Sequence, residues 1–161
     1  MRSPLTLDLL RHGHALQQSP GGDRGRPLSP AGRREIEALA RRLAREGTRY
    51  NRALASPLKR AAESAALLLA ALAAAPAVET FDALTPESSP TDLLAALRDL
   101  GLEGGHVLLV GHQPLLGQSA LVLTRAETAF APGTLARIEC PRGLAAGAGR
   151  VLTVLHPESG G

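Results

Sequence analysis

Several residue types that carry particular functions are scarce in this sequence of 161 residues. Cys140 is the one cysteine, so the chain has no internal disulfide framework, and neither a cysteine metal knuckle nor a redox pair is available. The aromatic residues are Phe81, Phe130 and Tyr50, which are too few to build a stacking platform for single-stranded nucleic acid. These absences favour a cytoplasmic protein and argue against a nucleic-acid partner.

A long hydrophobic run is also missing. The longest apolar stretch, residues 65–76, is about half the length that crosses a bilayer, and alanine dominates it. We therefore expect a buried helix there and no membrane partner. The first residues hold a single arginine, Arg2, and then a short apolar run, which is not the layout of a secretory signal. We expect the mature chain to start at Met1.

Basic charge is carried almost entirely by arginine. Lys59 is the one lysine among 18 basic residues, and the formal net charge is +3. The charges are spread without a basic block, although the positive balance favours an anionic substrate. The length and a hydrophobic content of 44% fit one globular domain with a real core, which we take to span residues 1–161.

Strand and helix patterns alternate along the chain. Residues 5–10 form a mostly apolar run with little alternation, which is typical of a central strand covered on both faces. Ser29-Pro30 and Ser56-Pro57 each supply a cap and a first-turn proline, which predict helices that end at Gly47 and near Pro76. The other predicted elements are strands near 52–55, 78–81, 107–110, 134–139 and 151–155, and helices near 91–100 and 115–123. This order predicts an α/β fold, a three-layer αβα sandwich with a mostly parallel central sheet and an antiparallel edge.

Polar residues follow three of the predicted strands. Arg11-His12 follows the first strand, the segment from Ser56 to Arg60 follows the second, and Gly111-His112 follows a later apolar strand. Ligands of open α/β sheets bind at the carboxyl ends of the strands, so we expect the three clusters to converge on one pocket. His106 and His156 lack such a context and are predicted to take surface or strand-edge roles.

The residues of these clusters suit phosphoryl transfer. A phosphoryl group in transfer spreads negative charge over three oxygens, and it therefore needs several cations around one nucleophile. A neutral ring nitrogen of His12 is predicted to attack phosphorus, while a backbone carbonyl holds the other nitrogen and fixes the tautomer. Arg11 and Arg60 are predicted to grip the oxygens, and a protonated His112 to add charge. Ser56 is interpreted as a helix cap rather than a nucleophile.

Ordered motifs cover nearly the whole chain. They are Leu10-Arg11-His12-Gly13, Asp23-Arg24-Gly25-Arg26-Pro27-Leu28-Ser29, Ala55-Ser56-Pro57-Leu58-Lys59-Arg60-Ala61, Leu84-Thr85-Pro86, and residues 107–116 with Gly111-His112-Gln113-Pro114 at their centre. On these motifs the sequence resembles the histidine phosphatase superfamily, and within it the small phosphohistidine phosphatases of SixA type. The resemblance implies a phosphoglycerate mutase-like fold and a hydrolysis without metal or cofactor. It also implies that His12 is the nucleophile that becomes phosphorylated, and that Arg11, Arg60 and His112 form the catalytic phosphate pocket.

Two positions depart from the pattern of the family. Larger members carry a glutamate general acid after the third strand, and here the candidate is Glu87, which follows the Leu-Thr-Pro form of small relatives. Position 14 is usually acidic in these relatives and is His14 here. His12 and His14 form a His-x-His pair, but the chain is too short for the eight-stranded barrels in which such pairs bind metal. No metal site is therefore predicted.

The pocket rim is expected to come from the loop over residues 17–27. Asp23 and Arg26 in this loop either form an ion pair that shapes the rim, as their match to small relatives suggests, or are solvated loop charges. The short chain leaves little sequence for a lid, so the pocket is expected to be shallow and open.

Three functions fit these observations. The leading hypothesis is a phosphohistidine phosphatase acting on a phosphorylated protein, because an imidazole leaving group needs a general acid less than an alkoxide does. The second is a broad phosphomonoesterase acting on small phosphoesters. The third is a non-catalytic phosphate-binding module, which His14 and the uncertain register of Glu87 leave open.

Overall fold

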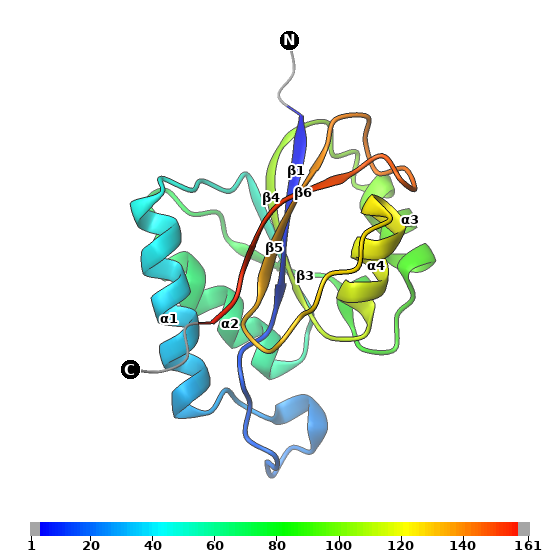
Figure 1. Ribbon diagram of the computed structural model, residues 1–161. Coiled ribbons are helices and arrows are strands. Elements are labelled where there is room, and N and C mark those ends of the chain that lie inside the picture. The colour runs from blue at the N-terminus through cyan, green and yellow to red at the C-terminus, as the bar shows by residue number, and fades with distance from the viewer. Residues whose placement is uncertain (1–3, 158–161) are drawn as a thin grey trace.

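Six strands form one sheet in the order β3-β2-β4-β1-β5-β6. The computed structural model describes residues 4–157, so Met1 and Arg2, on which the expectation about the start of the chain rests, lie outside the described residues. The strands are β1 (Leu5–Arg11), β2 (Arg52–Ala55), β3 (Val78–Thr80), β4 (Gly105–Gly111), β5 (Leu135–Cys140) and β6 (Arg150–Leu155), and the helices are α1 (Pro30–Arg45), α2 (Lys59–Ala70), α3 (Pro90–Asp99) and α4 (Leu115–Thr124). Figure 1 shows the helices in two groups beside the sheet.

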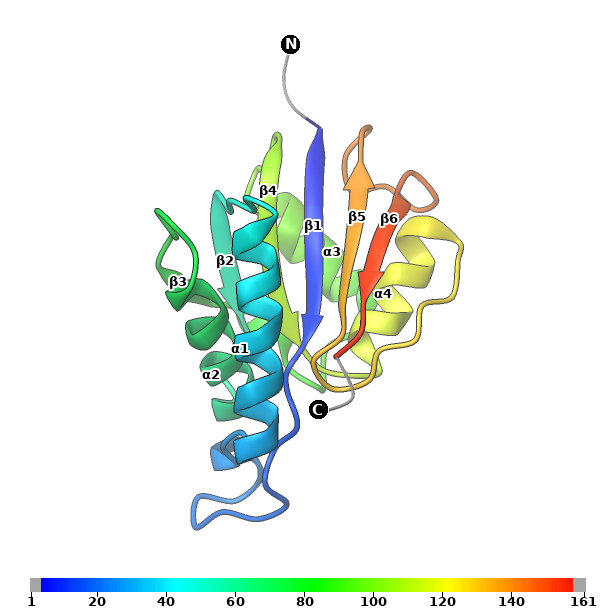
Figure 2. The same ribbon diagram turned by 60° about the vertical axis from the view of Figure 1, so that its left-hand side comes forward.

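The sheet is parallel over four strands and antiparallel at one edge. Strand β1 pairs in parallel with β4, which continues through β2 to β3, whereas β5 pairs antiparallel with both β1 and β6. β1 lies between β4 and β5, near the centre of the sheet, as Figure 2 shows. The predicted mostly parallel sheet with an antiparallel edge is confirmed.

The two faces of the sheet are buried against different pairs of helices. Leu7 and Leu9 of β1 pack with residues of α3 and α4, and Leu10, which follows them, packs with residues of α1 and α2. All three leucines are fully buried. A strand covered on both faces has no solvent side to keep polar, which explains why β1 reads as an almost continuous apolar run. The three-layer αβα arrangement is that of the prediction.

Helix α1 begins where the sequence predicts. The Ser29 hydroxyl accepts a hydrogen bond from the backbone nitrogen of Gly32 at 3.0 Å, and Pro30 occupies the first helical position. Such a cap is worth about 1 kcal/mol, because it satisfies one of the free N–H groups at the start of the helix. Ile36 and Leu43 lie on the buried face, and the arginines lie mainly on the other.

The predicted start of helix α2 is wrong. The helix begins at Lys59 with Leu58 in the cap position, and it ends at Ala70 rather than near Pro76. Ser56 does not cap it, because its hydroxyl contacts the Leu58 nitrogen, ahead of the helix, and the ring of His112. The Ser56 backbone nitrogen donates to the Val110 carbonyl at 3.0 Å and so still belongs to the sheet. No helix among the described residues is long and apolar enough to cross a membrane.

A buried carboxylate ties three strands together. Asp8 in β1 has no exposed surface, accepts hydrogen bonds from Arg137 of β5 at 2.9 and 3.0 Å, and lies 2.8 Å from His106 of β4. The Tyr50 hydroxyl donates to the same carboxylate at 2.5 Å. The prediction of a surface or strand-edge role for His106 is wrong, because its side chain is only 20% exposed and faces this carboxylate.

Candidate active site

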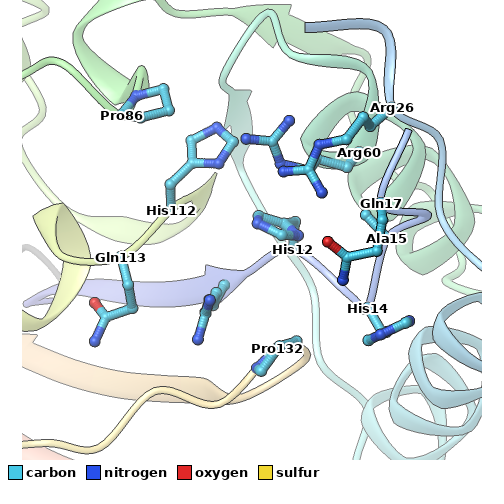
Figure 3. Close-up of a pocket in the computed structure, with 11 residues that line it drawn as sticks. His12, His14, Ala15, Gln17, Arg26, Arg60, Pro86, His112, Gln113 and Pro132 are labelled. Atoms are coloured by element: carbon cyan, nitrogen blue, oxygen red, sulfur yellow. The ribbon is translucent and has the colours of Figure 1, made fainter. Parts of the chain in front are cut away.

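The three predicted clusters meet in one pocket at the carboxyl ends of β1, β2 and β4. Strand pairing brings them together, since the His12 backbone nitrogen donates to the Gly111 carbonyl at 3.0 Å and the Ser56 nitrogen donates to Val110 at 3.0 Å. The pocket holds about 290 Å³, and His12, Arg60 and His112 line it (Figure 3). Arg11 is a further lining residue. The other lining residues are His14, Ala15, Gln17, Arg26, Pro86, Gln113 and Pro132.

His12 is held in one tautomer. Its Nδ1 lies 2.7 Å from the Gly13 carbonyl, an oxygen that can only accept, so Nδ1 carries the hydrogen and Nε2 keeps its lone pair. Burial lowers the pKa of His12 to about 4; the Gly13 hydrogen bond opposes the shift, and the charges of Arg60 and Arg11 add to it. The ring is therefore neutral near pH 7, with an unprotonated Nε2.

The turn after His12 leaves no space for larger residues. A Cβ on Gly13 would lie 3.0 Å from the Ile36 side chain and 3.1 Å from the Gly32 carbonyl, and a Cβ on Gly32 would collide with the His14 backbone. The Gly13 nitrogen donates to the Ser64 hydroxyl at 3.0 Å. The close crossing of this turn over the start of α1 holds the carbonyl that orients His12.

The two arginines are fixed by carbonyl oxygens on opposite sides of the pocket. Arg11 donates to the Phe130 carbonyl at 2.8 Å, and Arg60 donates to the Asp23 carbonyl at 2.9 Å. The Nε atoms of both side chains are buried and have no hydrogen-bond partner among residues 4–157. Buried guanidinium nitrogens without partners are costly, so the arrangement favours an anionic ligand that would accept from these side chains.

His112 is oriented by Ser56, which the sequence analysis misinterprets as a cap. The Ser56 hydroxyl lies 2.8 Å from Nε2 of His112 and accepts from the Leu58 nitrogen at 3.2 Å, and both side chains are buried. Nδ1 of His112 is buried without a partner within the described part of the chain. With Leu58 donating to its oxygen, the Ser56 hydroxyl is free to donate to Nε2, which leaves the ring hydrogen on Nδ1.

The expected protonated His112 is not what the surroundings favour. Burial lowers the pKa of His112 to about 3, and the neighbouring His12 and Arg60 add to the shift. The two imidazole rings lie 5.0 Å apart between their centroids, so a charge on one disfavours a charge on the other. His112 is thus a neutral hydrogen-bond donor at neutral pH rather than a third cation.

The pocket rim contains the ion pair that the sequence analysis considers. Arg26 donates to the Asp23 carboxylate at 3.0 Å and to the Leu16 carbonyl at 3.1 Å. Burial raises the pKa of the Asp23 carboxyl group, but Arg60, 3.5 Å away, and Arg26 together lower it overall. Arg26 lines the pocket, whereas Asp23 is not among the lining residues. The Asp23 carboxylate contacts both Arg26 and Arg60.

Glu87 does not line the pocket. Its side chain is 70% exposed and lies 4.0 Å from Arg24, while its neighbour Pro86 forms part of the wall. Of the residues that the structure describes, none of those lining the pocket is an aspartate or a glutamate. His14 also lines the wall, and its Nδ1 lies 2.7 Å from the Ser29 hydroxyl.

Comparison with known proteins assigns this geometry to a family. Residues 7–85 match the model of the histidine phosphatase superfamily (branch 1), a segment that includes Arg11, His12 and Arg60. An uncharacterized protein of Picosynechococcus is 34% identical over 126 residues, which cover 77% of this chain and 76% of the relative. The chain belongs to the histidine phosphatase superfamily. It is accordingly a hydrolase of the phosphatase class.

Solved structures of SixA phosphatases are similar over nearly the whole length of this histidine phosphatase. The structure of the protein histidine phosphatase SixA complexed with tungstate has a TM-score of 0.84 at 25% identity, covering 95% of this chain and 97% of that one. A SixA protein from Nakamurella multipartitia, described as a putative phosphohistidine phosphatase, has a TM-score of 0.82 at 26% identity, with 98% of each chain covered. The fold is therefore phosphoglycerate mutase-like, and the chain is of SixA type.

Sequence reasoning misses several residues of this histidine phosphatase pocket. Gln113 and Pro132 line it, and Ser64 supports the turn after His12. Gln113 stands beside His112 in the sequence and could have been named from that position, whereas Ser64 and Pro132 carry no signal before the fold is known. Within the described residues, no group of three or more histidine, cysteine, aspartate or glutamate side chains could hold a metal ion.

Proposed function

We propose that this chain hydrolyses phosphohistidine in a protein substrate, through a covalent phosphoryl intermediate on His12. The observation that carries the proposal is the combination at the pocket floor. A neutral imidazole with a free Nε2 stands beside two arginines whose Nε atoms are buried, and no carboxylic acid lines the wall within residues 4–157. Such a site suits transfer between two imidazole nitrogens, because the leaving group needs little help from an acid. We assign this activity to one domain, residues 1–161, and to the cytoplasm.

In the first step, the lone pair on Nε2 of His12 forms a bond to phosphorus, and the bond from phosphorus to the substrate imidazole breaks. The leaving nitrogen keeps the bonding electrons, and a proton on the other nitrogen of the substrate ring lets it depart as neutral imidazole. Arg11, Arg60 and the Nδ1 hydrogen of His112 bind the three phosphoryl oxygens as charge builds on them. The hydrogen bond from Nδ1 of His12 to Gly13 keeps the attacking nitrogen aimed at phosphorus.

In the second step, a water molecule attacks phosphorus from the side that the product has left. The bond from phosphorus to Nε2 breaks, its electrons return to His12, and both protons of the water stay with the phosphate, which is released as dihydrogen phosphate. We propose that no metal ion takes part, since the fixed charges of Arg11 and Arg60 supply the stabilisation that a metal would give. The similarity to a SixA protein solved with tungstate, a tetrahedral oxyanion, supports a phosphate site here.

A small-molecule phosphomonoesterase is the second candidate. The observation that favours it is the set of polar residues at the entrance, Gln17, Arg26 and His14, which can bind other polar groups of a small phosphoester. A non-catalytic phosphate-binding module stays a third interpretation, and it would show phosphate binding without turnover of any donor.

A substrate panel separates the three functions. Phosphate release is measured with a phosphohistidine peptide, a phosphoserine peptide and a sugar phosphate, for the wild type and His12→Ala. We expect kcat/KM for phosphohistidine to exceed the others by at least about a hundredfold and to be lost in His12→Ala. Faster turnover of the sugar phosphate would contradict the proposal and favour the phosphomonoesterase. Binding of inorganic phosphate without turnover of any of these substrates would favour the non-catalytic phosphate-binding module.

A further inference from the structure

A second hollow continues from the phosphate pocket along α4. It holds about 490 Å³ and lies between the outer face of α4 and the segment over residues 127–129. Its lining residues are Gln113, Pro114, Gly117, Gln118, Leu121, Glu127, Thr128 and Ala129, and we call it the α4 groove. Gln113 lines both the pocket and the groove, and Figure 3 places it on the side of the pocket away from Arg26. The two hollows therefore form one continuous surface.

The outer face of α4 is unusual for an exposed helix because it carries no charge. The sequence of α4, LLGQSALVLT, contains no charged residue, whereas α1 carries many arginines and glutamates. Leu121 is 43% exposed and Val122 is 36% exposed, and both are among the large hydrophobic side chains left open to solvent. Leu121 lines the groove, so its exposed apolar side chain beside the pocket is available to a partner.

The groove is held in shape by its own hydrogen bonds. The Gln113 side-chain oxygen accepts from the Gly117 nitrogen at 2.7 Å, and a Cβ on Gly117 would lie 3.0 Å from the Gln113 amide nitrogen. At the other end, the Thr124 hydroxyl donates to the Ala120 carbonyl at 2.7 Å and accepts from the Ala126 nitrogen at 3.1 Å. A preformed groove binds at a lower entropic cost than one that must be ordered by its ligand.

Charge along this surface changes from positive to negative. The phosphate pocket carries Arg11, Arg26 and Arg60, the middle of the surface is neutral, and Glu127 is the one charged lining residue that the structure describes in the groove. Glu127 is exposed and has no ion-pair partner among residues 4–157. A ligand that fits this order presents a phosphoryl group, then an apolar side chain, then a cation.

We propose that the α4 groove docks the polypeptide segment that flanks the phosphohistidine of the substrate. The segment is amphipathic, with an apolar side chain against Leu121 and a lysine or arginine opposite Glu127. This inference rests on the proposed function, since it names the part of the molecule that selects a protein substrate over a small phosphoester. A small substrate would occupy the phosphate pocket and leave the groove untouched.

The test uses an amphipathic helical peptide with one histidine, phosphorylated by potassium phosphoramidate, that carries a leucine and an arginine on the face of the phosphohistidine. For this peptide we expect Leu121→Asp to raise KM about tenfold with kcat unchanged, from lost apolar burial. For free phosphohistidine we expect Leu121→Asp to have the same KM and kcat as the wild type. Leu152→Asp is the matched control, because Leu152 is 46% exposed on β6 and does not line the groove.

A charge exchange tests Glu127. We expect Glu127→Lys to raise KM for the arginine peptide about threefold to fivefold. For a peptide with glutamate in place of the arginine, we expect Glu127→Lys to have a lower KM than it has for the arginine peptide. An equal KM for both peptides in Glu127→Lys would contradict the charge pairing.

The outcomes separate this inference from the proposed function. Failure of the wild type to hydrolyse any phosphohistidine would overturn the proposed function. Hydrolysis of the peptide with the same KM in Leu121→Asp and the wild type would overturn the docking groove alone. Sedimentation of the wild type as a dimer that Leu121→Asp converts to a monomer, with peptide KM unchanged, would assign the groove to a second copy of this chain instead.

Discussion

The hydrogen bond from Nδ1 of His12 to the Gly13 carbonyl determines what this side chain can do. It fixes which nitrogen carries the hydrogen, and burial keeps the ring neutral, so Nε2 is available to a phosphorus atom across the physiological pH range. These contacts explain the histidine and the glycine of the Arg-His-Gly motif. The histidine is the nucleophile of the proposal, and the glycine fits where any side chain would press on α1.

The neutral state of His12 can be measured directly. We expect the ring nitrogens of His12, observed by NMR in protein labelled with ¹⁵N-histidine, to titrate near pH 4 and to show hydrogen on Nδ1 above that pH. The sign follows from burial, which disfavours the charged form and so lowers the pKa below the usual 6.5. His12→Gln identifies the signal. A midpoint near pH 6.5 would show that the ring is not desolvated as the structure indicates.

Ser56 gives a prediction about positioning. Ser56→Ala removes the hydrogen bond that orients His112, and we expect kcat to fall about tenfold or more while the protein stays folded. Ser56→Thr keeps a hydroxyl and is expected to retain most of the activity. Ser88→Ala, outside the pocket, serves as the control. Equal activities of the alanine and threonine variants would contradict the positioning role.

At the scale of the elements, the Asp8 carboxylate links β1 to β4 and β5 inside the sheet. Burial alone would raise its pKa, but the hydrogen bonds and charges of His106 and Arg137 lower it overall. We expect Asp8→Asn to lower the free energy of unfolding at pH 7 by about 3 kcal/mol, because Arg137 would lose its charged partner in a largely buried place. Urea unfolding measures this.

The pH dependence of the Asp8 effect has a definite sign. A carboxyl group with a lowered pKa contributes stability above its unfolded pKa of about 4, and this contribution is lost as the pH falls through the folded value. The free energy of unfolding of the wild type should therefore approach that of Asp8→Asn below about pH 4. Glu79→Gln, which breaks an exposed pair with Arg52, should cost at most about 1 kcal/mol. An equal decrease in the free energy of unfolding in Asp8→Asn and Glu79→Gln would contradict the stabilising role of the buried Asp8 carboxylate.

Most elements of this fold could be predicted from local patterns, and the exceptions have physical reasons. The Ser29-Pro30 start of α1 is correct because its cap and proline act locally. The same Ser-Pro pair at Ser56-Pro57 predicts the wrong helix start. Ser56 is still paired to β4, and its hydroxyl contacts His112, a residue 56 positions away. Long-range pairings of this kind leave no periodic signal in the sequence.

At the scale of the whole molecule, parallel pairing explains why the site could be foreseen. Strands β1, β2 and β4 run in the same direction, so the polar residues after each of them must meet at one edge. That Glu87 does not line the pocket could not be foreseen, since this depends on the path of the loop after Pro86. The α4 groove also needs the structure, because it forms between a helix and a loop that follows it.

The assembled pocket predicts a response to oxyanions. We expect saturating tungstate to raise the melting temperature of the wild type by roughly 5 °C, since ligand that binds only the folded state stabilises it. Arg60→Ala should abolish this shift, because the buried guanidinium group of the pocket is lost. Arg24→Ala, an exposed arginine outside the pocket, should keep it. An undiminished shift in Arg60→Ala would place the oxyanion elsewhere.

The central claim is that His12 takes the phosphoryl group, and rapid quenching tests it most directly. A ³²P-labelled phosphohistidine peptide is mixed with the protein, the reaction is stopped in base within milliseconds, and the label is mapped by proteolysis. The account predicts an acid-labile phosphoryl group on His12 that forms and decays at the rate of turnover, and its absence together with loss of turnover in His12→Ala. Turnover without label on His12, or undiminished turnover by His12→Ala, would contradict it.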